Sequence, residues 1–68
     1  MNWISCNEKL PNDIEDVLFF AYGDEIILGY YNHKLNLWFE NKCFDYGIEQ
    51  KKVTHWTPLI KPTLFLQP

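Results

Sequence analysis

The apolar positions of the chain fall into short β-favouring runs that are separated by turn residues. Residues 17–22, V-L-F-F-A-Y, are apolar throughout, which is typical of a central strand covered on both faces. Gly23 and Asp24 follow, and residues 25–32 form a second β-rich run. Two such runs joined by two residues that begin with glycine predict a hairpin with a type II′ turn at Gly23-Asp24.

Two further runs extend this pattern. Residues 37–42, L-W-F-E-N-K, alternate weakly after a polar turn, and residues 53–57 form a last run that Pro58 ends, because proline has no N–H to donate. Four such strands predict a mostly β fold: a small antiparallel four-stranded meander that Gly29 curls into a half-open, SH3-like barrel. The whole chain, residues 1–68, is expected to form a single domain.

Local signals leave little room for helix. Ser5 and Glu8 have the spacing of a capping box, but Pro11 follows soon after, so the sequence predicts at most one short helical turn near the N-terminus. Residues 43–47 are typical of a loop, and residues 48–52 fit either a turn or the start of a short strand.

Alternation divides the second strand between two faces. One face carries Ile26, Leu28 and Tyr30, and the other carries Ile27, Gly29 and Tyr31. Glycine inside a strand indicates a bulge, a bend or a close neighbour. One tyrosine of the pair is expected in the core and the other at the surface. The alternative is a stacking platform of both tyrosines with Trp38, for a base or an aromatic partner.

Composition shows how so short a chain can build a core. A domain of 68 residues buries only about 60% of the surface that its unfolded chain exposes. Aromatic residues make up 18% of the chain, and each buried ring removes roughly 150–250 Å² from water, so a few rings suffice for a dense core. Some of the remaining rings are expected to face a partner.

Charge narrows the class of partner. The chain has six Lys, no Arg and nine acidic residues, for a net charge of −3. Phosphate backbones and anionic membranes are bound by cations, so direct nucleic-acid binding and membrane association are not expected. An acidic protein of this kind is suited instead to a basic protein surface.

The side chains that bind metals or support redox chemistry form no recognisable site. The two cysteines are Cys6 and Cys43, and no leader or apolar run of about 18 residues is present, which predicts a cytoplasmic location with reduced thiols; one disulfide is the lesser alternative. The cysteines and histidines form no C-x-x-C pair, so no zinc site and no cofactor is expected. Asp13, Glu15 and Asp16 lack the glycine and the spacing of a calcium loop and predict an exposed acidic turn.

The stretch V-T-H-W-T-P-L, residues 53–59, is the most distinctive in the chain. Neighbouring residues of a strand point to opposite faces, so His55 and Trp56 cannot form one local site. Trp56 is expected in the core and His55 on the other face, without a catalytic role. Ser5 and Cys43 are candidate nucleophiles by residue type alone, and no catalytic residue is predicted.

Several short motifs together resemble one small domain family that is found in phages, prophages and bacteria and has no established activity. The motifs are W-I-S at 3–5, L-P at 10–11, V-L at 17–18, G-Y-Y at 29–31, Trp38 and T-H-W-x-P-L at 54–59. Cys6 stands where this family usually has Val, and Thr57 where it usually has Met. The resemblance implies a compact β domain in a phage-type setting and assigns a function to no residue.

The surplus of rings, the acidic surface and the apolar tail at residues 64–66 favour a binding module over an enzyme. We expect a non-enzymatic, phage-type accessory protein that binds and blocks a host protein, such as a component of its defence. The predicted partner-binding residues are Tyr31, Trp38, His55 and Phe65. The alternative is a homo-oligomer that holds a small nucleotide-type ligand at its subunit interfaces. The tail also predicts a two-fold homodimer.

Overall fold

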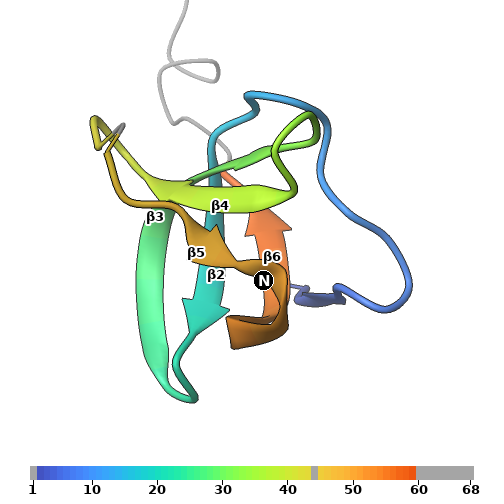
Figure 1. The fold of residues 1–68 in the computed structure, drawn as a ribbon. Helices are drawn as coiled ribbons and strands as arrows, with labels where there is room; N and C mark the ends of the chain where they lie inside the picture. The colour runs from blue at the N-terminus through green and yellow to red at the C-terminus, as the bar shows by residue number, and fades with distance from the viewer. Residues whose placement is uncertain (1, 44, 60–68) are drawn as a thin grey trace, which may run out of the picture.

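The structure, a computed structural model, describes residues 2–43 and 45–59. They form one antiparallel sheet of six strands in the spatial order β1-β6-β2-β3-β4-β5 (Figure 1). The elements are β1 (Ile4–Ser5), β2 (Val17–Ala21), β3 (Glu25–Asn32), β4 (Leu37–Glu40), β5 (Ile48–Glu49), the 3-10 turn η1 (Gln50–Lys52) and β6 (Val53–Pro58). Within these residues no helix has the length and apolar character needed to cross a bilayer.

The mostly β, antiparallel fold is confirmed, whereas the four-stranded arrangement is wrong. Strands β2, β3 and β4 pair consecutively as expected, but β6 returns to pair with β2 instead of continuing the meander. Two strands of two residues each lie at the edges of the open sheet, β1 beside β6 and β5 beside β4. Strands this short show no alternation, so the sequence pattern could not detect them. An SH3-like closure stays a prediction.

The β2–β3 hairpin lies where the sequence predicts it, but its turn is of a different kind. Ala21 pairs with Glu25, so three residues rather than two connect the strands. Tyr22 has a φ of 54° and Gly23 a φ of 92°, whereas a type II′ turn needs a positive φ only at its first central residue. The hairpin is therefore closed by a three-residue connection in which Tyr22 and Gly23 both have positive φ. Gly23 adopts this conformation without strain, and Tyr22 does not.

Strand β6 contains one extra residue opposite β2. The pairing register skips a position between His55 and Val53, which leaves Thr54 as a β-bulge. The bulge interrupts the two-residue alternation, so Val53 and Trp56, three positions apart, are both buried in the core. Thr54 and His55 are then neighbouring exposed residues.

Large aromatic side chains dominate the core. The core residues are Val17, Phe19, Ala21, Tyr31, Trp38, Ile48, Val53 and Trp56. The ring of Trp38 packs on Phe19 and Tyr31, with centroid separations of 4.8 and 4.9 Å. Trp56 is 3% exposed, and its Nε1 donates a hydrogen bond to the Lys9 carbonyl oxygen at 2.8 Å. The predictions that Trp56 is buried and His55 is exposed are therefore confirmed.

Gly29 allows β3 and β4 to approach closely. A Cβ atom at this position would overlap the carbonyl oxygen of Phe39, its neighbour on β4. Of the three alternatives that a glycine inside a strand indicates, the close neighbour is the one confirmed.

The N-terminal turn is hydrogen-bonded but not helical. The Ser5 carbonyl oxygen accepts hydrogen bonds from the N–H groups of Glu8 and Lys9 at 3.0 and 3.2 Å. Ser5 Oγ accepts another from the N–H of Asn7 at 3.2 Å. In the described part of the chain, the helical turn is η1 instead, within the residues that the sequence left open between turn and strand.

Candidate functional site

The outer face of the β2–β3 hairpin carries a row of apolar side chains. Leu18 pairs with Leu28, and Phe20 pairs with Ile26. Residues directly opposite each other on antiparallel strands share a face of the sheet. Trp3 extends the row, because the centroid of its ring lies 4.5 Å from that of Phe20. These five side chains, Trp3, Leu18, Phe20, Ile26 and Leu28, are called the hairpin face below.

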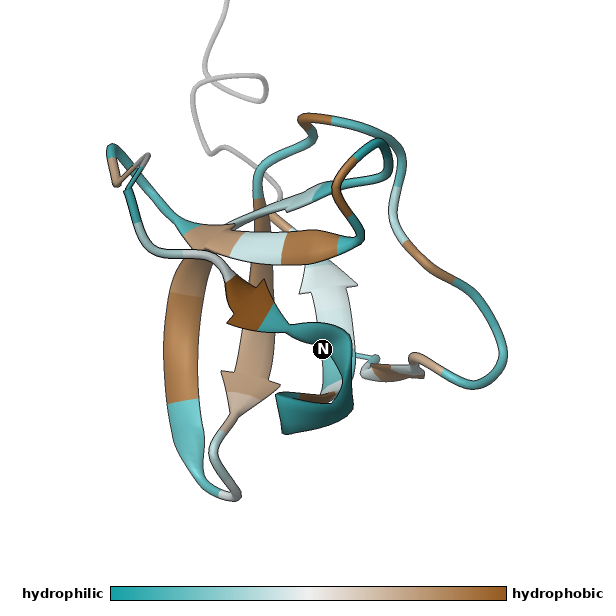
Figure 2. Cartoon of the chain, viewed as in Figure 1, coloured by the Kyte–Doolittle hydropathy of each residue, from teal (hydrophilic) through white to brown (hydrophobic). Residues whose placement is uncertain are grey.

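The hairpin face is only partly covered. Ile26 and Leu28 are 57% and 37% exposed, while the other three side chains are half-buried. Figure 2 shows the apolar stretch of β3 directly next to the hydrophilic tip of the hairpin. Single apolar residues on a surface are ordinary, whereas a contiguous row is typical of an interaction surface.

The tip of the hairpin places negative charge and a tyrosine with a strained backbone beside this row. Asp24 and Glu25 are both exposed. Tyr22 is 53% exposed and keeps its φ of 54°, in a region that a bulky side chain rarely adopts. Residues held in such conformations are found disproportionately at functional sites. The tip therefore borders the apolar row with negative charge.

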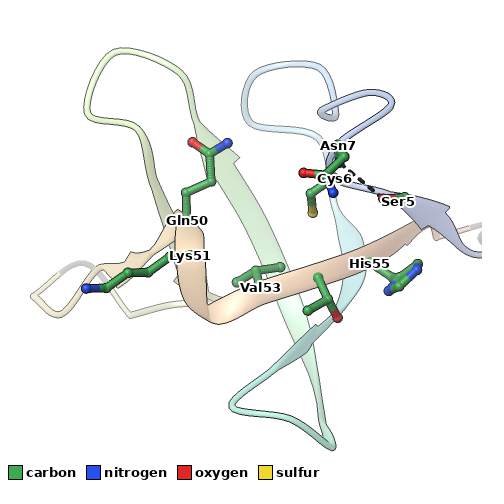
Figure 3. A pocket seen from close by; sticks show the side chains of 8 residues that line it. Ser5, Cys6, Asn7, Gln50, Lys51, Val53 and His55 are labelled. Carbon is green, nitrogen blue, oxygen red and sulfur yellow. Dashed lines mark hydrogen bonds between the residues drawn. The ribbon is translucent and has the colours of Figure 1, made fainter.

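A cleft lies at the open side of the sheet, between the turn after β1, the 3-10 turn η1 and β6. Its volume of about 590 Å³ is in the range of small-molecule sites. Figure 3 shows Gln50 and Cys6 on opposite walls, with Val53 on the strand between them. This concavity is called the seam cleft, and its described lining consists of Ser5, Cys6, Asn7, Gln50, Lys51, Val53, Thr54 and His55.

A small polar cluster connects one wall of the seam cleft to the core. The hydroxyl of Tyr31 lies 3.2 Å from Asn36 Oδ1 and 3.1 Å from Gln50 Oε1. A phenol carries a single proton, so it donates to one amide, and the other amide must turn its NH₂ group towards the phenol oxygen. Burial raises the pKa of Tyr31, with a smaller contribution from the Cys6 charge, which keeps the hydroxyl neutral. The cluster therefore holds Gln50 in place from behind.

The thiol of Cys6 is not activated as a nucleophile. Burial raises its pKa from 9.0 to about 11, so the thiol is protonated at neutral pH. A reactive cysteine needs a lowered pKa, usually from a neighbouring cation or a helix N-terminus. His55 lines the same cleft but does not lower the pKa of this thiol.

The four predicted partner-binding residues lie in different parts of the chain. Tyr31 and Trp38 are 1% and 0% exposed and pack on each other in the core, so neither ring lies at the surface. His55 is exposed and lines the seam cleft. Phe65 lies outside the described residues. Alternation is confirmed for the tyrosine pair, because Tyr30 is half-buried outside the core and stacks on Phe39 at 5.5 Å.

The side chains of the hairpin face are not among the partner-binding residues that the sequence predicts. A signal for them was present, because residues 17–22 are apolar on both faces and Ile26 and Leu28 share a face of the next strand. In a chain of 68 residues, the other described elements leave this second apolar face partly exposed.

The acidic turn at residues 13–16 is not arranged as an ion site. Among residues 2–43 and 45–59, no group of three or more His, Cys, Asp or Glu side chains could hold a metal ion. Asp13 Oδ1 instead accepts a hydrogen bond from the backbone N–H of His33 at 3.1 Å. Cys6 and Cys43 are free thiols in the structure.

Comparison with known proteins identifies the family. No curated protein and no solved structure matches the chain. The family described as "Protein of unknown function (DUF551)" matches residues 2–64, a range that includes all six strands and the T-H-W-x-P-L motif at 54–59. The resemblance to an uncharacterised domain family is thereby confirmed. The chain belongs to the DUF551 family of proteins of unknown function.

Proposed function

We propose that this chain is a non-enzymatic binding module that docks its hairpin face on a partner protein. The observation that carries the proposal is the contiguous apolar row of β2 and β3, of which Ile26 and Leu28 remain exposed next to an acidic tip. Each Å² of apolar surface that a partner covers contributes roughly 25 cal/mol to association before the costs of docking are subtracted. A partner that covers this row therefore buries exposed apolar area, which contributes favourably to the free energy of association.

Charge defines the kind of partner. Asp24 stands in the turn at the end of the row, Glu25 pairs with Ala21 and faces the other side of the sheet, and the whole chain carries a net charge of −3. Such an acidic end is complementary to an apolar patch that is bordered by Lys and Arg, and it repels phosphates and acidic surfaces. We therefore propose a partner protein with a basic rim around an apolar centre.

The state of Cys6 supports a non-enzymatic role. The seam cleft has a volume of about 590 Å³, within the range of small-molecule sites, and the thiol in its described lining has a pKa raised to about 11 by burial. A thiol that is protonated at neutral pH is a poor nucleophile. The unactivated thiol therefore supports the proposal of a binding role for this cleft.

The biological setting of the proposal comes from the family resemblance. A phage-type accessory protein acts in the cytoplasm of its host, so we propose a host protein as the partner and inhibition as the result, for example of a defence component. The module would inhibit by covering an apolar surface that its target needs for its own contacts.

Two exposed apolar residues provide a matched test. Ile26 lies on the hairpin face and is 57% exposed, whereas Leu35 lies in the β3–β4 turn and is 55% exposed. We expect the intact chain and Leu35→Ser to retain the same host protein from lysate and Ile26→Ser to lose it, with all three proteins melting at similar temperatures. Equal retention by the two variants would show that the hairpin face is not the docking surface.

Self-association is the competing use of the same surface. Sedimentation of the purified chain distinguishes the two, because a homodimer through the hairpin face would dissociate on dilution and would be absent in Ile26→Ser. A concentration-dependent dimer with no retained host protein would replace the proposed partner by a second copy of this chain. Deleting residues 63–68 then tests whether the apolar tail contributes to that dimer.

A further inference from the structure

The seam cleft is a concavity that the proposed docking surface does not use. Two segments far apart in the sequence enclose it: the end of β1 with the turn that follows, and the continuous stretch of η1 and the bulged part of β6. Its volume of about 590 Å³ can hold a small organic molecule, whereas the hairpin face is a sheet surface. The cleft therefore calls for a ligand of a different kind.

The lining is rich in hydrogen-bond donors and poor in negative charge. Donors come from two hydroxyls, two amides, an ammonium group and an imidazole, on Ser5, Thr54, Asn7, Gln50, Lys51 and His55. The lining residues that the structure describes include no carboxylate, although the chain has nine acidic residues. In an acidic protein, a cleft with this lining favours a ligand with an excess of acceptors and a negative charge.

The side chains on the walls and the floor of the cleft are Gln50, Asn7 and Val53, and an internal contact holds Gln50. Gln50 is fixed from behind by its 3.1 Å contact with the Tyr31 hydroxyl, and Figure 3 shows its amide across the cleft from Asn7. Val53, which is 4% exposed, provides an apolar floor between them. An apolar floor beside a polar side chain that is held in place, here Gln50, is part of the usual construction of a small-ligand site.

Lys51 stands at one end of the cleft, and Figure 3 shows its exposed side chain extended away from Cys6 and Asn7, so its ammonium group must swing inward to reach a ligand. Its Nζ lies 3.9 Å from Glu49 Oε2, and both side chains are largely exposed. An exposed ion pair at this distance is weak, so an anionic ligand can compete for the ammonium group. His55 stands at the opposite end, as Figure 3 shows.

From this arrangement we infer that the seam cleft binds a small organic anion, with its phosphate or carboxylate group near Lys51 and the amide donors and its apolar body over Val53. No residue of the hairpin face lines the cleft, although His55 at its end pairs with Phe20 of that face, so small anions are tested on the chain without a protein partner.

Two pairs of probes test the inference on the full chain. The affinity for adenosine monophosphate is compared with that for adenosine to test a phosphate group, and the affinity for benzoate is compared with that for benzamide to test a carboxylate. Backbone amide chemical shifts of the isotope-labelled protein report where each probe binds. We expect at least one anion to shift the amides of Asn7, Gln50 and Thr54 and to bind at least about fivefold more tightly than its neutral counterpart.

A pair of charge reversals locates the site. Lys51→Glu and Lys42→Glu change the net charge equally, but Lys42 lies in the β4–β5 connection outside the described lining of the cleft. Lys51→Glu should weaken anion binding at least about fivefold, and Lys42→Glu should leave it nearly unchanged. The inference is overturned if both variants weaken binding equally, if the neutral probes bind as tightly as the anions, or if no probe shifts the cleft amides at about 10 mM.

Discussion

The two faces of the β2–β3 hairpin are made of similar side chains but differ in how much of their surface is buried. On the inner face, Val17, Phe19 and Ala21 are fully buried. On the outer face of the same strands, Phe20 is half-buried and Ile26 is more than half exposed. Position 19 and position 20 hold the same residue type, so the difference lies in what covers each face and not in the chemistry of the side chains.

This contrast shows how a short chain divides its apolar residues. The described elements β4, β5 and β6 supply enough rings and aliphatic groups to close the inner face, and among the described aromatic residues Trp3 packs on the outer one. A complete second layer on the outer face would need more covering elements than residues 2–43 and 45–59 provide. We therefore assign stability to the inner face and binding to the outer face, and the predictions below test that division.

The largest expected effect is the loss of stability on replacing Trp56 of the inner face, compared with Trp3 of the outer face. Trp56→Ala should lower the free energy of unfolding by about 3–5 kcal/mol, because it empties a buried site and removes the hydrogen bond to Lys9. Trp3→Ala, on the outer face, should cost less than about 2 kcal/mol. Denaturant unfolding of both variants checks this, and equal losses would mean that the two faces contribute alike.

The next largest effect is expected at Gly29, where β3 approaches β4 closely. Gly29→Ala should destabilise the fold by about 2–3 kcal/mol, because the new Cβ would overlap the carbonyl oxygen of Phe39 on the adjacent strand. Gly47→Ala is the control, since a Cβ there meets the Leu37 side chain, which can change rotamer. Thermal melting of the pair should show the larger shift for position 29, and the reverse order would contradict the close approach of β3 and β4.

The hairpin tip is expected to show a smaller and more specific effect. Gly23→Val should lower stability by at least about 1 kcal/mol, because a β-branched residue resists the φ of 92°. Gly23→Asn should be tolerated better, since asparagine enters this region more readily. Similar melting midpoints for the two variants would contradict the claim that the positive φ at position 23 limits which residues are tolerated there.

The smallest effect is a pH dependence at the seam cleft. Because burial raises the pKa of Cys6 from 9.0 to about 11, the folded state holds this proton more tightly than the unfolded state. That contribution is complete below pH 9 and is lost as the pH rises from 9 towards 11. Between pH 9 and 11 the free energy of unfolding should fall more steeply with pH for the intact chain than for Cys6→Ser. Equal slopes for the two proteins would mean that the thiol is exposed to solvent in the folded state.

The long strands could be predicted from the sequence because each carries a pattern long enough to recognise. The apolar run beginning at Val17, the Gly23 hairpin and the proline stop at Pro58 are all local signals, and the structure confirms their positions. The edge strands β1 and β5 could not be predicted, because two residues show no period. The bulge at Thr54 also escaped detection, since it follows from pairing with β2 and not from the sequence of β6.

The surfaces were harder to predict than the fold. Tyr31 and Trp38 were expected at a binding surface because rings are common there, but their partners Phe19 and Gln50 lie far away in the sequence and bury them. The seam cleft likewise joins Cys6 to Gln50 across most of the chain. Such juxtapositions depend on strand order, which local patterns do not specify.

The most direct test of the division between the faces is a photo-cross-linking measurement in host lysate. A benzoylphenylalanine is placed at position 26 on the hairpin face or at position 35 in the β3–β4 turn, two sites whose native side chains are 57% and 55% exposed. The account predicts that position 26 forms an adduct with one defined host protein and that position 35 forms none. Adducts of equal yield at both positions, or an adduct at position 35 alone, would contradict it.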